Sequence, residues 1–568
     1  MDDWSYCEIA RILSEEGRLD MTDWPSMSLI FQVFCGSILI KIFGMKYSIL
    51  HIFSYIMGFC SVLTLYYLLI EFKIKRKVSL LCSLILLVNP IFLSLSYTFM
   101  TDIFFLALVL ISIFCYIKGL KNVFNVKLNK GEKSYYKIFI IALTLSILSS
   151  LVRQIGILIS MSAGITLLLC CFKIFDCENK FKEKRSDFFK LSLLILLLPI
   201  ILIFIFQYWM ALQFGVSGSL GEKIDFIRNN WNLGLLPYRT YAIFSYLGIF
   251  LFPLVIISIS DFLKFQTKQK ENHKNFLKKN SLLVTSVLVF VVLFIIYSFT
   301  TPQKSPFFSS DKISSLFPYF ENMISNFSTG PLTLRDTYIL HYPPPFEIPS
   351  FFILIISIVG SLSGSWLFYL LLKKIISYIK NYKKSEFIHW YNISQFFILL
   401  VSGFYILQLY FYNKAFDRYI IFLIPLFSIL LFSNNSGYMK EGFKNSFKAK
   451  RQYFIAQILI FLFLIISVTG LHDYISWNKG RWNAVDYLFA KGIKPEVIDG
   501  GFEFNGLFTY NSARTYEKER EDLSWWWVVD DEYIIAFNKL PNYSVHKKFS
   551  YTTFLPPGKK NILLIKRK

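Results

Sequence analysis

Residues 191–212, LSLLILLLPIILIFIFQYWMAL, are the stretch that decides the fold. This segment contains no Asp, Glu, Lys or Arg, and a helix needs roughly 20 such residues to cross a bilayer. It follows a strongly charged segment, 173–190, with the sequence KIFDCENKFKEKRSDFFK. Long apolar segments that alternate with short basic ones are typical of a polytopic integral membrane protein.

The composition of the whole chain agrees with this interpretation. The 568 residues are 55% hydrophobic, and the formal net charge is +23. Such a charge is common in nucleic-acid-binding proteins, but here Lys and Arg lie in short runs between apolar segments. We therefore expect membrane lipid and no nucleic acid as a partner. The eight cysteines form no CxxC motif and the histidines are scattered, so neither a zinc site nor a disulfide framework is predicted.

Outward from 191–212, the chain contains further apolar segments that we predict to be transmembrane helices. Every second connecting segment is rich in Lys and Arg, and the alternate ones are nearly uncharged. This alternation places the N-terminus, the long segment 300–348 and the C-terminal tail on the non-cytoplasmic side. The twelve predicted spans are 47–71, 78–96, 100–118, 137–152, 156–172, 190–212, 239–262, 281–299, 349–371, 391–412, 418–433 and 453–470.

The N-terminal residues 1–46 are expected to form an external segment. Segment 4–19 has helical spacing but several charges, and Gly17 is placed to end its helix. Segment 28–43 is apolar but too short for a full span. We predict that both are helices lying along or dipping into the membrane interface.

After residue 470 the composition becomes that of a soluble domain. We predict an amphipathic helix at 477–492 and strands at 495–501, 531–537 and 561–567. The chain is therefore divided into the external segment 1–46, a transmembrane helical domain at 47–470 and a small C-terminal α/β domain outside the membrane at 471–568.

Few ionisable residues occur in the external segments, and five of them are candidates for chemistry: Asp2, Asp3, Asp102, Arg153 and Arg418. Asp102 stands at the outer start of a predicted span, where it is either an active-site acid or a helix N-cap. Each arginine either contacts the membrane interface or binds an anionic lipid headgroup through its bidentate guanidinium. From these residues alone, a transporter fits as well as an enzyme.

Several motifs in this order resemble a known family. They are DDWSY (2–6), LLVNPIFLSLSYTFMTDIFF (86–105), SSLVRQIG (149–156), FDRYIIFLIPL (416–426) and GIKPEVIDGGFEFNG (492–506). The chain thereby resembles bacterial GT-C membrane glycosyltransferases of the protein O-mannosyltransferase and lipid A aminoarabinose transferase type, which are similar to glycosyltransferase family 39.

The resemblance implies an all-α polytopic membrane fold and transfer of a sugar from a polyprenyl-phosphate donor to a hydroxyl on a glycan, lipid or protein. It implies catalytic roles for Asp2, Asp3 and Asp102, and binding of the donor phosphate by Arg153 and Arg418. Whether a divalent metal ion takes part is left open. The implied location is the bacterial inner (plasma) membrane, with the active site and the C-terminal domain on its outer side.

Two alternatives are kept: a transporter or flippase of lipid-linked sugars, and an inactive truncated relative. The family has a further span before its acidic loop, which would raise the count from about twelve to thirteen. We therefore expect an in-frame apolar segment in the DNA upstream of the codon for Met1.

Overall fold

The computed structural model is mainly helical, and its long apolar helices support an integral membrane protein. Among the described residues, eight helices are long and apolar enough to cross a membrane, or nine if one bent pair counts as a single span. The predicted class, a polytopic helical membrane protein with a small C-terminal α/β domain, is confirmed. The described residues are 2–21, 24–25, 27–125, 132–172, 185–215, 224–268, 280–300, 323–324, 329–346, 348–381, 390–412, 415–433, 447–515 and 526–568.

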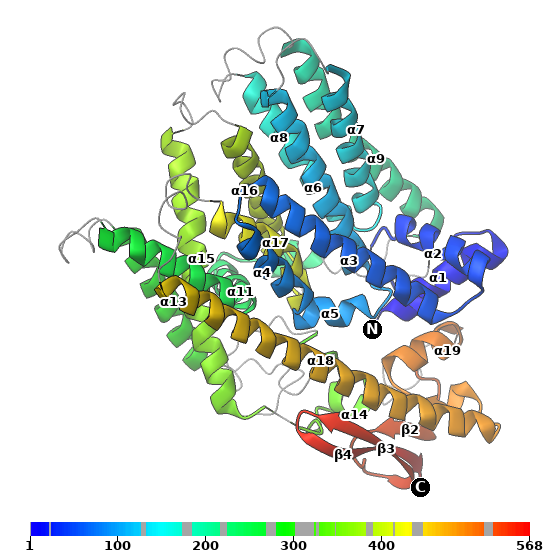
Figure 1. Ribbon diagram of the computed structural model, residues 1–568. Helices are drawn as coiled ribbons and strands as arrows, with labels where there is room; N and C mark the ends of the chain where they lie inside the picture. The colour runs from blue at the N-terminus through cyan, green and yellow to red at the C-terminus, as the bar shows by residue number, and fades with distance from the viewer. Residues whose placement is uncertain are drawn as a thin grey trace.

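The eight long apolar helices supply most of the transmembrane bundle. Pairs of them pack side by side, notably α11 with α15 and α8 with α9 (Figure 1). Their bounds are α3 (Tyr47–Glu71), α6 (Thr101–Asn125), α8 (Ile157–Cys171), α9 (Arg185–Phe214), α11 (Leu235–Lys268), α15 (Ser350–Asn381), α16 (Trp390–Leu409) and α18 (Phe447–Ala490).

The predicted count of twelve spans is not confirmed. In three of the predicted spans the apolar helix is shorter than a full crossing: Tyr136–Ser150 within α7 (Glu132–Ser150), Ser281–Tyr297 within α13 (Ser281–Thr300), and α17 (Leu423–Phe432). α17 contains only 10 residues because the preceding η5 (Asp417–Phe422) is a 3-10 helix. A pattern of apolar residues does not distinguish a 3-10 turn from the start of an α-helix.

The predicted span at 78–96 is bent. α4 (Arg76–Leu87) and α5 (Pro90–Ser96) meet at an angle of 61°. The side chain of Asn89 accepts hydrogen bonds from the backbone N–H groups of Ile91 and Phe92, and Pro90 has no N–H to continue the preceding helix. Asn89-Pro90 therefore starts a new helix inside one apolar segment.

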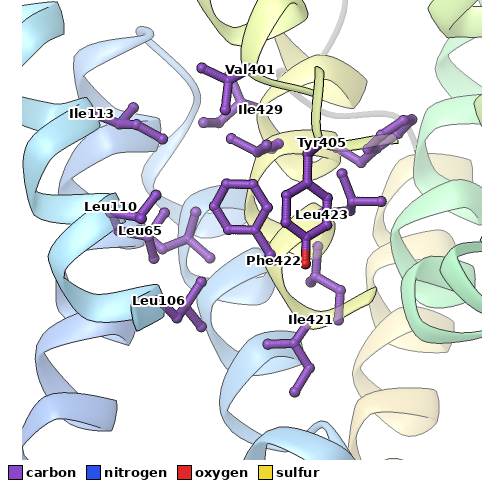
Figure 2. Close-up of a cluster of buried hydrophobic side chains, with 14 of the residues drawn as sticks. Leu65, Leu106, Leu110, Ile113, Val401, Tyr405, Ile421, Phe422, Leu423 and Ile429 are labelled. Carbon is purple, nitrogen blue, oxygen red and sulfur yellow. The ribbon is translucent and has the colours of Figure 1, made fainter. Parts of the chain in front are cut away.

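The core of the bundle lies where α3, α6, α16 and α17 meet. Figure 2 shows Leu106 and Leu110 of α6 facing the rings of Tyr405 and Phe422, and all four side chains are buried. The two ring centroids are 4.3 Å apart. Through Phe422, this packing holds η5, which also carries Arg418, against α6.

Helices occur at both predicted places, as α1 (Asp3–Glu16) and α2 (Ile30–Phe43), and their position along the membrane interface stays a prediction. Gly17 ends α1 in the left-handed conformation, with a φ of 68° that favours glycine. Figure 1 shows both helices between the transmembrane bundle and the C-terminal domain. α1 therefore has neighbours on both sides, and its residues from Trp4 to Cys7 are buried.

α18 connects the bundle to the C-terminal domain without a break. We predicted a span at 453–470 and a separate helix at 477–492, but a single helix of 44 residues covers both. This correction has a simple cause: the intervening residues 471–476, LHDYIS, contain neither Pro nor Gly. Gly492, with a φ of 74°, lies just beyond the end of the helix.

A four-stranded sheet packs beneath the second half of α18 (Figure 1). Its strand order is β1-β2-β4-β3, with β1 parallel to β2 and the other pairs antiparallel. The strands are β1 (Ile498–Asp499), β2 (Tyr533–Ala536), β3 (Tyr543–Phe554) and β4 (Pro557–Arg567).

Two elements of this domain were missed from the sequence. β3 is mostly exposed and carries Lys547 and Lys548, so it shows no apolar run. α19 (Phe502–Thr515) follows directly on Gly500-Gly501, at the end of the segment 495–501 that we predict as a strand. The short elements elsewhere are η1 (Gln154–Gly156), the π-helix η2 (Phe226–Asn230), α14 (Arg335–Tyr338) and η6 (Pro495–Val497).

The end of segment 300–348 is attached to this domain. Asp336 of α14 is buried, and its Oδ2 accepts hydrogen bonds from the backbone N–H groups of Phe537 and Asn538 at 2.9 and 2.8 Å. The side-chain amide of Asn538 also donates to this oxygen. α14 and the end of β2 are thus held together through one carboxylate.

α19 approaches α1 so closely that only glycine fits at position 506. A Cβ atom there would lie 2.3 Å from Cε2 of Trp4, whose ring also contacts Tyr510 and Trp527. We expect Gly506→Ala to lower the free energy of unfolding by about 1–3 kcal/mol through overpacking. Unfolding of the purified chain in detergent measures this change.

Gly480→Ala in α18 is the matched control. Both glycines are helical, so both substitutions gain the same intrinsic helix propensity of about 1 kcal/mol. At Gly480 the nearest atom to the new Cβ is 3.4 Å away, which is an ordinary contact. Equal stability changes in the two variants would contradict the close approach of α19 and α1.

Candidate functional site

Four of the five predicted site residues lie together, and we call Asp2, Asp102, Arg153 and Arg418 the charged cluster. Each stands at or next to the end of a helical element: Asp2 precedes α1, Asp102 lies in the first turn of α6, Arg153 precedes η1, and Arg418 lies in η5. The ends of a helix leave backbone N–H or C=O groups without helical partners. The four elements therefore bring polar helix ends to one place.

Asp102 and Arg153 form a buried ion pair. Arg153 Nη2 lies 2.8 Å from Asp102 Oδ1, and the two side chains are only 5% and 4% exposed. Arg153 Nε also donates a hydrogen bond to Thr101 Oγ1 at 2.7 Å. Within the described part of the chain, Asp102 Oδ2 is buried without a hydrogen-bond partner. The Asp102 carboxylate therefore pairs with Arg153 and retains one unused acceptor.

Asp2 and Arg418 form a looser pair. The distance between Asp2 Oδ2 and Arg418 Nη2 is 3.7 Å. The indole N–H of Trp24 donates to the other oxygen, Asp2 Oδ1, at 3.0 Å. The Asp2 side chain is 25% exposed, whereas Asp102 is almost completely buried. Asp2 is thus the carboxylate of the charged cluster that a second molecule can reach.

Tyr419 joins the two pairs into one site. Its ring lies 5.6 Å from the guanidinium carbon of Arg153 and 5.7 Å from that of Arg418, so one aromatic ring contacts both cations. The hydroxyl of Tyr405 donates to the backbone carbonyl of Tyr419 at 2.9 Å. Tyr6 of α1 interacts electrostatically with the charged cluster and is itself buried.

Asp3 faces different neighbours. Its charged neighbours include the N-terminal amine, His51 and Glu503. Burial raises the pKa of Asp3, which favours its protonated form. The two adjacent acids of the N-terminal segment therefore have different surroundings.

Asp417, the neighbour of Arg418, binds backbone instead of pairing closely with that arginine. It is completely buried, and its carboxylate accepts hydrogen bonds from the backbone N–H groups of Met323 and Ile324 at 2.7–3.1 Å. Asp417 thereby attaches Met323 and Ile324 of segment 300–348 to the charged cluster.

The pH dependence of stability is expected to contain a contribution from Asp417. Burial raises its pKa from 3.8 to about 7, against the opposing effect of the backbone N–H groups. Between these two values the folded chain binds this proton and the unfolded chain does not. We therefore expect the free energy of unfolding to fall as the pH rises from about 4 to about 7.

Asp417→Asn should remove this contribution, because Asn does not titrate and its side-chain oxygen still accepts a hydrogen bond. Unfolding midpoints of both proteins, measured in detergent from pH 4 to pH 8, give the comparison. Parallel pH profiles for the two proteins would show that Asp417 does not titrate in this range.

Sequence reasoning missed several residues of the site. Thr101 and Tyr419 are immediate neighbours of Asp102 and Arg418, so adjacency to a predicted charge was an available signal. Tyr6 lies in the quoted DDWSY motif, where helical spacing from Asp2 could have identified it. Tyr405 lies inside an apolar span and gave no such signal.

The arrangement can bind an anion and accept a proton. Arg418 Nε is buried without a hydrogen-bond partner among the described residues, and the long contact to Asp2 leaves its guanidinium able to bind a further anion. The partly exposed carboxylate of Asp2 can accept a proton. Among the described residues, no group of three or more His, Cys, Asp or Glu could hold a metal ion.

No protein-family model matches the chain, and no curated protein sequence matches it. Solved structures do. The Archaeoglobus fulgidus oligosaccharyltransferase tethered with an acceptor peptide is 13% identical, with a TM-score of 0.40 over 84% of this chain and 53% of that one. The same archaeal enzyme, AglB, in complex with an inhibitory peptide and a dolichol-phosphate is 14% identical, with a TM-score of 0.40 over 85% and 54%.

ArnT from Cupriavidus metallidurans bound to undecaprenyl phosphate is 12% identical, with a TM-score of 0.31 over 76% of this chain and 73% of that one. The chain spans about half the length of the oligosaccharyltransferases that it matches. The chain is thus similar, at low identity, to an archaeal oligosaccharyltransferase and to ArnT.

Proposed function

We propose that the chain is an inverting glycosyltransferase that moves a sugar from a polyprenyl-phosphate donor to an acceptor hydroxyl on the non-cytoplasmic face of the membrane. The observation that carries this proposal is the accessible carboxylate of Asp2 beside Arg418, within one cluster that also holds the Asp102–Arg153 pair. The donor class follows from the resemblance of the sequence motifs.

The reaction assigns a separate task to each side of the charged cluster. The acceptor hydroxyl oxygen forms a bond to the anomeric carbon, while the bond from that carbon to the phosphate oxygen breaks. The hydroxyl proton passes to Asp2, and the phosphate leaves with the electron pair as polyprenyl phosphate. One displacement of this kind inverts the anomeric centre.

The arginines act on the leaving group. The phosphate is already an anion and needs no proton, only cationic stabilisation of the charge that it gains. Arg418 is the proposed first contact, because its guanidinium has the looser pairing. Arg153 is the proposed second cation, with Asp102 as the second acid of the site. Asp3 remains a proposed acid of the same segment.

We place the charged cluster and the C-terminal domain outside the bacterial plasma membrane, as the alternating basic segments predict. In this arrangement residues 1–46 carry the catalytic acid, 47–470 form the membrane domain, and 471–568 lie over the site. The part of the external segment near residue 336 and the C-terminal domain then border the acceptor side.

The test begins with mass spectrometry of cell-envelope glycans from cells with and without the gene, which identifies the sugar and the acceptor. The purified full chain is then supplied with that sugar on synthetic undecaprenyl phosphate, the lipid bound in the ArnT structure. We expect a new glycosidic bond whose anomeric configuration is opposite to that of the donor.

Two results would refute the proposal in different ways. A product with the same anomeric configuration as the donor would exclude a single displacement, and the chain would still be a glycosyltransferase. Gene-dependent movement of the lipid-linked sugar across vesicle membranes, without a new glycosidic bond, would indicate a transporter instead. The bent pair α4–α5 gives that second candidate some structural support, because broken spans are common in transporters.

A further inference from the structure

The C-terminal domain contacts the N-terminal segment through aromatic side chains. We call Trp4, Trp24, Phe502, Tyr510 and Trp527 the aromatic cluster; the first two come from the N-terminal segment and the others from the C-terminal domain. Trp24 is seated between two of these rings. Its centroid lies 4.9 Å from that of Trp527, at 83°, and 5.6 Å from that of Phe502.

The motif IDGGFEFNG fixes the position of Phe502. Asp499 Oδ1 accepts hydrogen bonds from the Gly501 backbone N–H at 3.2 Å and from the Asn505 side-chain amide at 2.9 Å. The side-chain oxygen of Asn505 accepts in turn from the Gly500 N–H at 3.1 Å. These three bonds are internal to the motif and buried, so the start of α19 is rigid and presents Phe502 in one place.

Trp527 is held just as firmly. Its backbone carbonyl accepts a hydrogen bond from Thr509 Oγ1 at 2.6 Å. Its ring packs against those of Trp4 and Tyr510, with centroid distances of 5.4 and 5.1 Å. The surface against which Trp24 packs is therefore held together by contacts that do not involve Trp24 itself.

The polar edge of Trp24 points to the charged cluster. Its indole N–H donates to Asp2 Oδ1 at 3.0 Å, while Asp2 Oδ2 faces Arg418 at 3.7 Å. An indole N–H can only donate a hydrogen bond, so Asp2 Oδ1 is the acceptor and is occupied by Trp24. The carboxylate is thus held from two sides, and Oδ2 is the oxygen nearer the cation.

We infer that Trp24 is a positioning residue, through which the C-terminal domain fixes the carboxylate of Asp2 for proton transfer. The inference rests on the proposed role of Asp2 as the base. It assigns the incoming proton to Oδ2. It also makes the C-terminal domain part of the reacting site, in addition to any part in acceptor choice. An unheld carboxylate next to the start of α1 would sample several rotamers, and only some would face the acceptor.

Trp24→Phe tests the inference, with Trp4→Phe as the matched control. Both substitutions keep an aromatic ring in the same aromatic cluster and remove an indole N–H. The N–H of Trp24 binds Asp2, whereas that of Trp4 is buried without a hydrogen-bond partner among the described residues. We expect Trp24→Phe to lower kcat by roughly tenfold or more, as for loss of a hydrogen bond to a charged group.

The same variant should leave the KM for the undecaprenyl-phosphate sugar and the Kd of undecaprenyl phosphate at their original values, because Trp24 contacts neither arginine. Trp4→Phe should leave kcat unchanged. Equal kcat values for the two variants, or a loss in Trp24→Phe that lies in KM alone, would overturn the inference. If Trp24→Phe does not fold, Trp527→Phe takes its place, and an unchanged kcat in it counts against the inference.

Asp2→Asn and the double variant separate this inference from the proposed function. If Trp24 acts through Asp2, Trp24→Phe should cause no further loss in an Asp2→Asn background. An inactive Asp2→Asn with a fully active Trp24→Phe would reject the positioning role and leave the proposed function standing. A fully active Asp2→Asn would reject the base itself, and the positioning role with it.

Discussion

Asp2→Asn is expected to lower the kcat of sugar transfer by roughly 10²–10⁴-fold, the usual contribution of a general base. The substitution keeps the size of the side chain and an oxygen that can accept the hydrogen bond from Trp24. It removes the negative charge beside Arg418 and the ability to accept the acceptor proton. The fold should therefore persist, and binding of undecaprenyl phosphate should be retained. Initial rates with the synthetic donor, at saturating donor, measure the change.

Asp3→Asn provides the matched comparison. It makes the same chemical change one residue away, at a carboxyl group whose neighbours are His51 and Glu503. We expect a much smaller effect on kcat than at Asp2. A large loss in Asp3→Asn with normal rates in Asp2→Asn would exchange the roles of the two acids. Equal and small losses of kcat in both variants would show that the base lies outside the N-terminal segment.

Arg153→Met is expected to produce the largest loss of stability among the site substitutions, about 3–5 kcal/mol. The reason is that Asp102, only 4% exposed, would remain buried without its partner cation. Replacing both partners, as Asp102→Leu with Arg153→Met, should recover most of the loss, since an apolar pair leaves no uncompensated charge. Unfolding by SDS in mixed micelles measures the free energies.

Arg11→Met is the control for the loss of an arginine ion pair. Arg11 pairs with Glu8 at 2.6 Å, but these side chains are 32% and 30% exposed. Solvent screens such a pair, so we expect a change of no more than about 1 kcal/mol. If Arg153→Met were as mild as this control, the Asp102–Arg153 pair would not be the buried contact described above.

The sequence predicted the parts of the fold that depend on local patterning. Helical spacing with Gly17 at its end was enough for α1, and the length of the apolar run was enough for α2. The charged cluster was predicted as a set of external charges next to helix ends. Its members are up to several hundred residues apart, so only the resemblance, and not their spacing, gave a reason to group them.

Contacts between distant segments could not be predicted in the same way. No local sequence pattern indicates that Trp24 contacts both Asp2 and Trp527, because Asp2 and Trp527 are separated from each other by most of the chain. The bend at Asn89-Pro90 illustrates a different limit. Its turn chemistry was visible in the sequence, but the surrounding residues are continuously apolar and dominated the prediction of an unbroken span.

The continuous helix α18 has a mechanical consequence. At 1.5 Å per residue its 44 residues measure ~66 Å, about twice the thickness of a bilayer core. The first part is apolar enough to cross the membrane and the second part packs against the sheet, so one continuous helix joins the two. Any tilt imposed by a thinner or thicker bilayer is transmitted to the sheet and to the aromatic cluster. We therefore expect bilayer thickness to affect how closely the C-terminal domain packs against the segment that carries Asp2.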